Sequence, residues 1–339
     1  MGRRGRRRIL ATCLTGSPGP VARAAAATSS RESHMKNIIA YLQLCRAANV
    51  FTALADVFLG YLLTHADFQP TQTFGLLLAS SAGLYMAGMV LNDLFDWKID
   101  ARERPERPIP SGRVSLRAAS VLAGLLILGG CAAATLVGPR STSVVSLLVG
   151  CILAYDGWLK RTPLGPVLMG GCRCLNVMLG ASVPAIGGEG LPAGLPLPDA
   201  YILHVAGSLG VYIAGVTWFA RQEAGRSVRW SLGLALVVIN LGLALLLAFV
   251  LHWPPGAPRS LNVALIIGLI AATLNHRAGK ALWHPGPAAV RQAITTMLLS
   301  IVMLDATVVM FVQPNPFYAV CVAGLLAPAL ILSRFLAMT

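Results

Sequence analysis

The sequence predicts an all-α fold, a polytopic transmembrane bundle of nine to ten helices. The 339 residues are 56% hydrophobic and only 12% charged, and the mean hydropathy is +0.69. This composition is too apolar for an ordinary soluble domain. Windows of about 20 apolar residues, the length that crosses a bilayer, follow one another along the chain. They leave no room for a separate soluble domain.

Each candidate span is an apolar window. The connections between these windows differ in how many basic residues they contain. The ten spans cover residues 38–64, 73–97, 115–137, 142–158, 164–186, 199–221, 229–251, 260–280, 288–312 and 316–337. Connections after the even-numbered spans are rich in Lys and Arg, whereas those after the odd-numbered spans contain only Arg140 and Arg259. By the positive-inside rule, we expect an integral protein of the bacterial inner membrane, with both termini and the site on the cytoplasmic side.

Residues 1–34 differ from the transmembrane domain, which we assign to residues 35–339. This first segment holds seven arginines and one glutamate, and its apolar run is too short for a secretory signal. We interpret it as a disordered extension, or as the result of an upstream start codon with Met35 as the working start. An organellar transit segment is the alternative.

Charge and cysteine usage argue against two other kinds of site. The net charge is +14, but the basic residues outside the first segment lie in short connections between apolar spans, so nucleic acid is not a predicted partner. Most of the seven cysteines lie inside apolar runs. Such cysteines are typically small buried hydrophobes rather than metal ligands.

The segment from Asn92 to Asp100, at the end of the second span, carries the strongest functional signal. At about 100° per residue, and with Asn92 set at 0°, Asp96 falls at about 40°, Asp100 at about 80° and Asp93 at about 100°. An Asp at the bilayer centre costs about 3 kcal/mol, so this face must border water, metal or basic groups. Carboxylates suit Mg²⁺. The four residues predict a Mg²⁺ site in which Asp93, Asp96 and Asp100 are catalytic.

A proline-rich loop with several arginines follows this face. Guanidinium groups bind phosphate oxygens in bidentate fashion, and prolines fix the course of the loop. We therefore predict a short lid in which Arg104 and Arg107 bind a diphosphate bridged by the metal. The alternative is a helix end whose acids merely pair with nearby arginines. The arginines of this region are Arg102, Arg104, Arg107 and Arg113.

These residues carry a resemblance to a known family. The pattern N-D-x-x-D-x-x-x-D from Asn92 to Asp100, followed by R-P-I-P-S-G-R at 107–113, resembles the first aspartate motif of the UbiA superfamily of intramembrane prenyltransferases. The segment Tyr155-Asp156-Gly157-Trp158-Leu159-Lys160-Arg161 is similar to the family's Y-x-x-x-L-K-R element. The helical layout of residues 36–338 is similar as well. The family usually has nine helices, so the resemblance implies a UbiA-type bundle.

The resemblance also implies substrates and further binding residues. It implies Mg²⁺, an allylic prenyl diphosphate as donor, and a lipophilic, mostly aromatic acceptor within membrane lipid. It assigns diphosphate binding to Lys160 and Arg161, substrate binding to Tyr155, and a cavity-facing position to Asn49. Arg173 and Asn176 lie three residues apart on one helix face and are expected to point inward, as further substrate-binding residues.

The sixth connection departs from the family pattern. Relatives carry a second aspartate cluster there, whereas residues 217–227 of this chain contain one acid, Glu223, flanked by Arg221 and Arg226. A cation can neutralise diphosphate in place of a metal, so we predict that Arg221 and Glu223 bind substrate. The degenerate second motif is similar to that of UbiA-like proteins from ebo-type clusters, which implies a divergent branch.

The sequence thus predicts a Mg²⁺-dependent prenyltransferase, with other functions left open. A non-catalytic binder or transporter of prenyl or polyprenyl phosphates would keep the cationic pocket without the second acid cluster. A CDP-alcohol phosphatidyltransferase fits poorly, because Trp97 stands where its motif needs Gly and no Asp lies within 112–120. A purely structural membrane protein would not need the acidic face. Asp305, in mid-span, is a further unpaired carboxylate that would be costly in lipid.

Overall fold

The computed structural model describes residues 35, 37–183, 199–221, 229–252, 259–283 and 286–337. These residues are helical or form short turns, and no strand occurs among them. The predicted N-terminal extension, residues 1–34, lies outside the described residues. Glu223, which we predicted to bind substrate, also lies outside them. The elements are η1 (Ala47–Asn49), α2 (Val50–Leu62), α3 (Thr71–Glu103), α4 (Leu116–Val137), α5 (Pro139–Ala154), η2 (Tyr155–Leu159), α6 (Gly165–Gly180), α7 (Asp199–Ala220), α8 (Arg229–His252), α9 (Ser260–Trp283), α10 (Pro287–Val312), α11 (Pro316–Gly324) and α12 (Leu326–Ala337).

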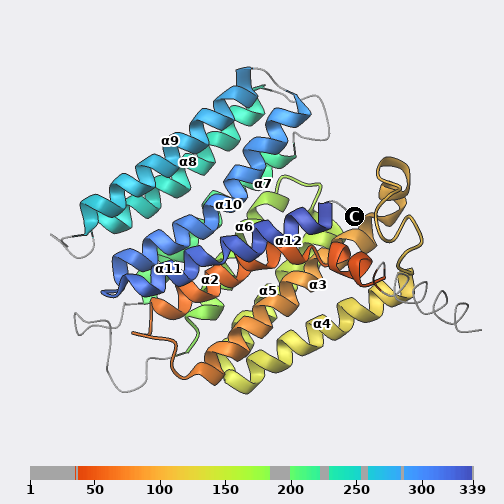
Figure 1. The fold of residues 1–339 in the computed structure, drawn as a ribbon, viewed down its shortest axis with the longest axis horizontal. Coiled ribbons are helices and arrows are strands. Elements are labelled where there is room, and N and C mark those ends of the chain that lie inside the picture. Colours follow the sequence, from red (N-terminus) through yellow and green to blue (C-terminus); the bar gives the residue numbers. More distant parts are fainter. Residues whose placement is uncertain are drawn as a thin grey trace, which may run out of the picture.

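The helices confirm the predicted transmembrane bundle. In the described part of the chain, eight helices are long and apolar enough to cross a membrane, and the number is nine if the pair Asn37–Leu44 and Ala47–Leu62, bent by 49°, counts as one span. The 16-residue α6 occupies the fifth predicted span and is shorter. Every one of the ten predicted spans therefore contains a helix. Figure 1 shows the helices side by side, from α8 and α9 at one edge to α4 at the other.

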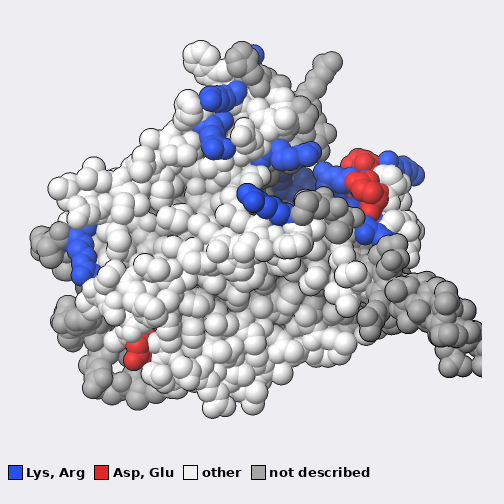
Figure 2. All heavy atoms as spheres, in the orientation of Figure 1, with Lys and Arg blue, Asp and Glu red and all other residues white. Residues whose placement is uncertain are grey.

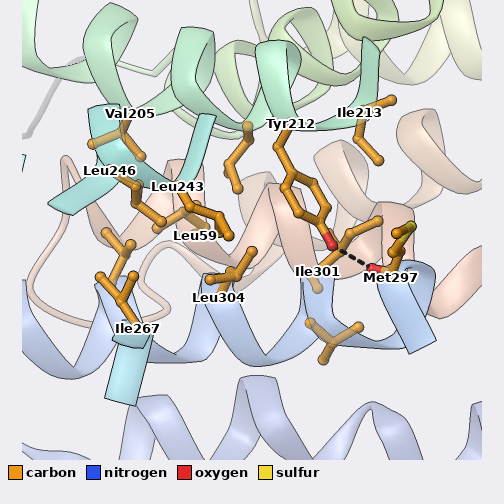
Figure 3. Close-up of a cluster of buried hydrophobic side chains, with 14 of the residues drawn as sticks. Leu59, Val205, Tyr212, Ile213, Leu243, Leu246, Ile267, Met297, Ile301 and Leu304 are labelled. Atoms are coloured by element: carbon orange, nitrogen blue, oxygen red, sulfur yellow. Dashed lines mark hydrogen bonds between the residues drawn. The ribbon is translucent and has the colours of Figure 1, made fainter. Parts of the chain in front are cut away.

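The largest core cluster joins the first and last thirds of the chain. It contains buried residues from α2, α7, α8, α9 and α10. Figure 3 shows Tyr212 of α7 pointing toward α10, where its hydroxyl donates a hydrogen bond to the Met297 carbonyl at 2.8 Å. Leu59 of α2 packs in the same cluster with 0% exposure. The buried Tyr hydroxyl keeps a partner, so the hydrogen bond offsets the cost of removing this group from water.

Glycines let α6 approach its neighbours closely. A Cβ atom at Gly180 would lie 2.5 Å from the Val57 carbonyl oxygen of α2, so only glycine fits at that crossing. Gly170 of α6 faces Gly210 of α7 in the same way. Small residues at such crossings are what allow membrane helices to pack backbone to backbone. These contacts fix α6, which carries the predicted residues Arg173 and Asn176, against α2.

Hydrogen bonds between the connections define two ends of the bundle. At one end, Arg221 donates to the Thr162 carbonyl at 2.7 Å, and Arg113 donates to the Gln43 side chain at 2.8 Å. At the opposite end, Gln313 donates to the Leu62 carbonyl at 2.6 Å and to the His65 carbonyl at 2.9 Å. The connections after spans 4 and 6 thus meet at one end, and those after spans 1 and 9 meet at the other.

We predict that Gly180→Val destabilises the α2–α6 crossing. Forcing a side chain into a closed backbone contact costs about 2–3 kcal/mol. The matched control is Gly171→Val on the same helix, where a Cβ atom would meet nothing within 4 Å. The measurement is the thermal unfolding midpoint of the purified protein in detergent. Equal midpoints for the two variants would contradict the close packing described above.

Candidate active site

The acidic face of α3 divides into two sets of contacts. On one side, Arg107 Nη1 lies 3.3 Å from Asp93 Oδ1 and 2.5 Å from Asp100 Oδ2. Arg46 Nη2 lies 3.4 Å from the same Asp93 oxygen. Asp93 and Asp100 are both 5% exposed. Two nearly buried carboxylates therefore depend on one shared guanidinium, and a second guanidinium supports Asp93.

The other set of contacts belongs to Asn92 and Asp96. Lys160 Nζ forms a close ion pair with Asp96 Oδ2, and Arg161 Nη2 lies 3.3 Å from Asp96 Oδ1. Asn92 donates to Asp156 Oδ1 at 3.1 Å. The division follows the angular positions around the helix. Asn92 and Asp96 lie toward one side of the face, and Asp100 and Asp93 lie toward the other. The four residues share one face of α3 as predicted. On that face, Asn92 and Asp96 contact different partners from Asp93 and Asp100.

A bend in the first span brings Arg46 to this end of the bundle. Arg46 has a positive φ of 46°, in the left-handed region, and stands between the Asn37–Leu44 segment and η1. A non-glycine residue there is strained and is often found at functional sites. Its side chain is 38% exposed and reaches Asp93. Arg46 was not among the site residues that the sequence predicted.

A π-helical turn, η2, positions the second set of cations. It follows α5 directly and runs from Tyr155 to Leu159, and such turns are frequent at functional sites. The turn buries Asp156, at 8% exposure, and leads into Lys160. Asp156 was missed by the sequence analysis, although it is an acid at the same end of a span as Asp96. That shared position is the signal that could have found it.

Arg221 holds this turn from α7. Its guanidinium donates to the Lys160 carbonyl and, at 2.7 Å, to the Thr162 carbonyl. Desolvation lowers the pKa of the Arg221 guanidinium, but the ordinary value is so high that the group stays charged. The structure thus gives Arg221 backbone partners next to Lys160. Its predicted contact with substrate stays a prediction.

A cavity of about 620 Å³ opens beside Asp93. Arg113 lines it and donates to the Glu106 carbonyl at 2.7 Å. Figure 2 shows most of the visible Lys and Arg side chains at one end of the bundle, with acids beside them, and a broad uncharged surface below. The cavity thus combines three arginines with two acids. Its lining comprises Gln43, Arg46, Asp93, Glu106, Arg107, Pro108, Arg113 and Leu336.

The donors present at this end fit a magnesium ion in part. In the described ranges, no group of three or more His, Cys, Asp or Glu residues is already arranged to hold a metal. However, oxygens of Asp93 and Asp100 converge on the single nitrogen Nη1 of Arg107. Mg²⁺ is commonly held by one or two carboxylates together with substrate phosphates. A pair of converging oxygens is that kind of donor set.

Two of the predicted binding residues lie deeper in the bundle. Arg173 Nε is 2.8 Å from Asp56 Oδ1, and Asn176 donates to Asp56 Oδ2 at 2.9 Å. They point inward as expected, but they form an interior cluster with Asp56 instead of joining the acidic end of α3. Asn49 is exposed at the end of η1 and interacts with the Tyr85 side chain. Arg104 is exposed at the end of α3.

Known proteins resemble this chain in sequence. The model of the UbiA prenyltransferase family matches residues 53–338. The digeranylgeranylglyceryl phosphate synthase of Methanoculleus marisnigri is 35% identical over 129 residues, which cover 38% of this chain and 45% of that protein. The synthase of the same name from Methanopyrus kandleri is 34% identical over 146 residues, which cover 42% and 53%. The chain thus spans about half the length of the curated relatives it matches.

Solved structures share the fold. A UbiA homologue from Aeropyrum pernix has a TM-score of 0.59 at 22% identity and covers 77% of this chain and 97% of that chain. A UbiA homologue from Archaeoglobus fulgidus, bound to GPP and Mg²⁺, has a TM-score of 0.56 at 16% identity and covers 84% and 99%. At these identities the likeness concerns the fold, which is a UbiA-type helical bundle.

We predict that Arg107→Met destabilises the acidic end of α3. Asp93 and Asp100 would lose their shared cation while nearly buried, which costs about 3 kcal/mol. The control is Arg102→Met, because Arg102 is exposed on the same helix. The measurement is the thermal midpoint in detergent, with and without Mg²⁺. Mg²⁺ should restore part of the loss. Equal midpoints for the two variants would contradict the role of Arg107.

Proposed function

The chain belongs to the UbiA prenyltransferase family, and we propose that it is a Mg²⁺-dependent, membrane-embedded prenyltransferase. It would transfer a prenyl group from an allylic prenyl diphosphate to a lipophilic acceptor. One observation carries the proposal: three α3 carboxylates meet four cations at one end of an apolar bundle. These groups are Asp93, Asp96 and Asp100 with Arg46, Arg107, Lys160 and Arg161.

Binding of the donor would exchange these internal ion pairs for contacts to the ligand. Asp93 and Asp100 would hold the metal through the oxygens that now share Arg107. Asp96 would join them, with Asn92 beside it. The bound Mg²⁺ supplies Lewis-acid stabilisation of the diphosphate charge. The arginines and the lysine released from the carboxylates are then free to bind phosphate oxygens.

The same cations would assist departure of the leaving group. When the bond between the prenyl carbon and the diphosphate oxygen breaks, negative charge grows on the diphosphate, and Lys160, Arg161 and Arg107 lie at this end to stabilise it. The prenyl tail would lie among apolar helices that exclude water. Exclusion of water protects the allylic cation until the acceptor attacks it.

The curated relatives point to the class of acceptor. By their name, their product carries two geranylgeranyl groups on a glyceryl phosphate. We therefore propose a prenylated glyceryl phosphate as the acceptor, in place of the aromatic acceptor that the family resemblance implied. The arginines lining the 620 Å³ cavity, Arg46, Arg107 and Arg113, suit an acceptor that carries its own phosphate. We also propose that this end of the bundle faces the cytoplasm, since the basic connections gather there.

We predict that Asp96→Ala lowers diphosphate release by about 100-fold or more, because one carboxylate of the charge-stabilising site is removed. The assay uses purified protein in lipid with Mg²⁺, labelled prenyl diphosphates of several lengths, and either a prenylated glyceryl phosphate or an aromatic acceptor. The control is Glu103→Gln, an exposed acid at the end of the same helix. Tight donor binding without release by the unaltered protein would support a carrier instead. Product formed with the aromatic acceptor alone would overturn the acceptor class.

A further inference from the structure

A second group of charges lies in the apolar interior, apart from the acidic end of α3. Asp56 on α2 and Asp305 on α10 are each 0% exposed. Arg173 on α6 is 9% exposed and forms a salt bridge with Asp56. Charged groups in the interior of a membrane protein are costly and mark functional positions by default. The proposed prenyl transfer uses neither of these two carboxylates.

Asp56 has both a charge partner and a hydrogen-bond partner. Arg173 Nε lies 2.8 Å from its Oδ1, and Asn176 Nδ2 donates to its Oδ2 at 2.9 Å. Asn176 is itself oriented, because its amide oxygen accepts a hydrogen bond from Ser81 at 2.8 Å. One buried negative charge is therefore matched by one positive charge.

Asp305 is not matched in this way. Neither of its oxygens has a hydrogen-bond partner in the described part of the chain, and the carboxyl lies within interaction distance of Asp56 and Arg173. If both carboxylates were ionised, the cluster would hold two negative charges and one positive charge without access to water. Two carboxylates cannot hydrogen-bond each other, because both only accept. A single proton turns one of them into a donor and removes the excess charge.

We propose that Asp56 and Asp305 form a proton-binding site that holds one proton between the two carboxyl groups. Both side chains are completely buried, so the site is closed to a ligand larger than a proton. The resulting O–H···O bond joins α2 to α10 across the bundle, while Arg173 and Asn176 join the same point to α6. The other titratable groups that face the cluster are Cys174 of α6, Tyr85 of α3 and Tyr212 of α7.

Infrared spectroscopy of the full chain in lipid tests the shared proton. The unaltered protein should show the C=O band of an aspartic acid that does not shift on brief transfer into D₂O, because the site is closed. Asp305→Asn and Asp56→Asn should each abolish the band, since the remaining carboxylate is then ionised beside Arg173. The control Asp67→Asn removes an exposed loop acid and should leave the band unchanged. Isotopic labelling of aspartate assigns the band.

Stability against pH gives an independent measurement. The folded form holds a proton that an unfolded Asp releases at about pH 4, so the stabilisation is fully present only below that pH and is lost as the pH rises toward the pKa of the folded site. The thermal midpoint of the unaltered protein should fall as the pH rises from about 4, and Asp305→Asn should remove that dependence. Absence of a protected band in the unaltered protein, or its persistence in Asp305→Asn, would overturn the proposal. The first outcome needs no variant to fold, and neither depends on prenyltransferase activity.

Discussion

Compensation of buried charge is the constraint on which the rest of the structure depends. The chain places carboxylates on helices that are otherwise built for lipid, and each needs a cation, a donor or a proton. At the end of α3 this need orders three separate elements. Asp93 contacts Arg46 at the bend, Asp100 pairs with Arg107 of the loop, and Asp96 pairs with Lys160 directly after the π-turn. The site is thus assembled by the same ion pairs that a ligand would later replace.

The sign of the charge imbalance differs between the two clusters, and it indicates what each can bind. At the end of α3, cations outnumber carboxylates, so the group as a whole favours an anion, such as a diphosphate with its metal. In the interior, two carboxylates face one guanidinium, so the group favours a cation, and the closed packing admits only a proton. Glycine crossings such as Gly180 on Val57 close the interior, whereas the proline-rich loop leaves the outer cluster open. Packing and charge together distinguish the two clusters.

The sequence predicted the helices well, because apolar windows and their basic connections follow from the bilayer itself. It also predicted the arc of Asn92, Asp96, Asp100 and Asp93, because helical angles depend only on spacing. It could not predict partners, which depend on how distant segments pack. The bend at Arg46 lies inside an apolar run with no proline or glycine to reveal it, and the π-turn shifts the register that would have placed Asp156. Arg173 and Asn176 point inward as predicted, but their depth required the packing of α6 on α2.

The ion pairs at the end of α3 are unequal, and this suggests an order for their exchange. Arg161 is 69% exposed and Arg46 is 38% exposed, so their contacts are screened by water and cost little to break. Arg107 is 20% exposed and bridges two carboxylates that are each 7% exposed at the side chain, so its release leaves buried charge unless another cation arrives. An incoming diphosphate would therefore engage Arg161 and Arg46 first. Under the proposed function, Asp93 and Asp100 would hold the metal in place of Arg107, so release of Arg107 from these carboxylates would be coupled to metal binding.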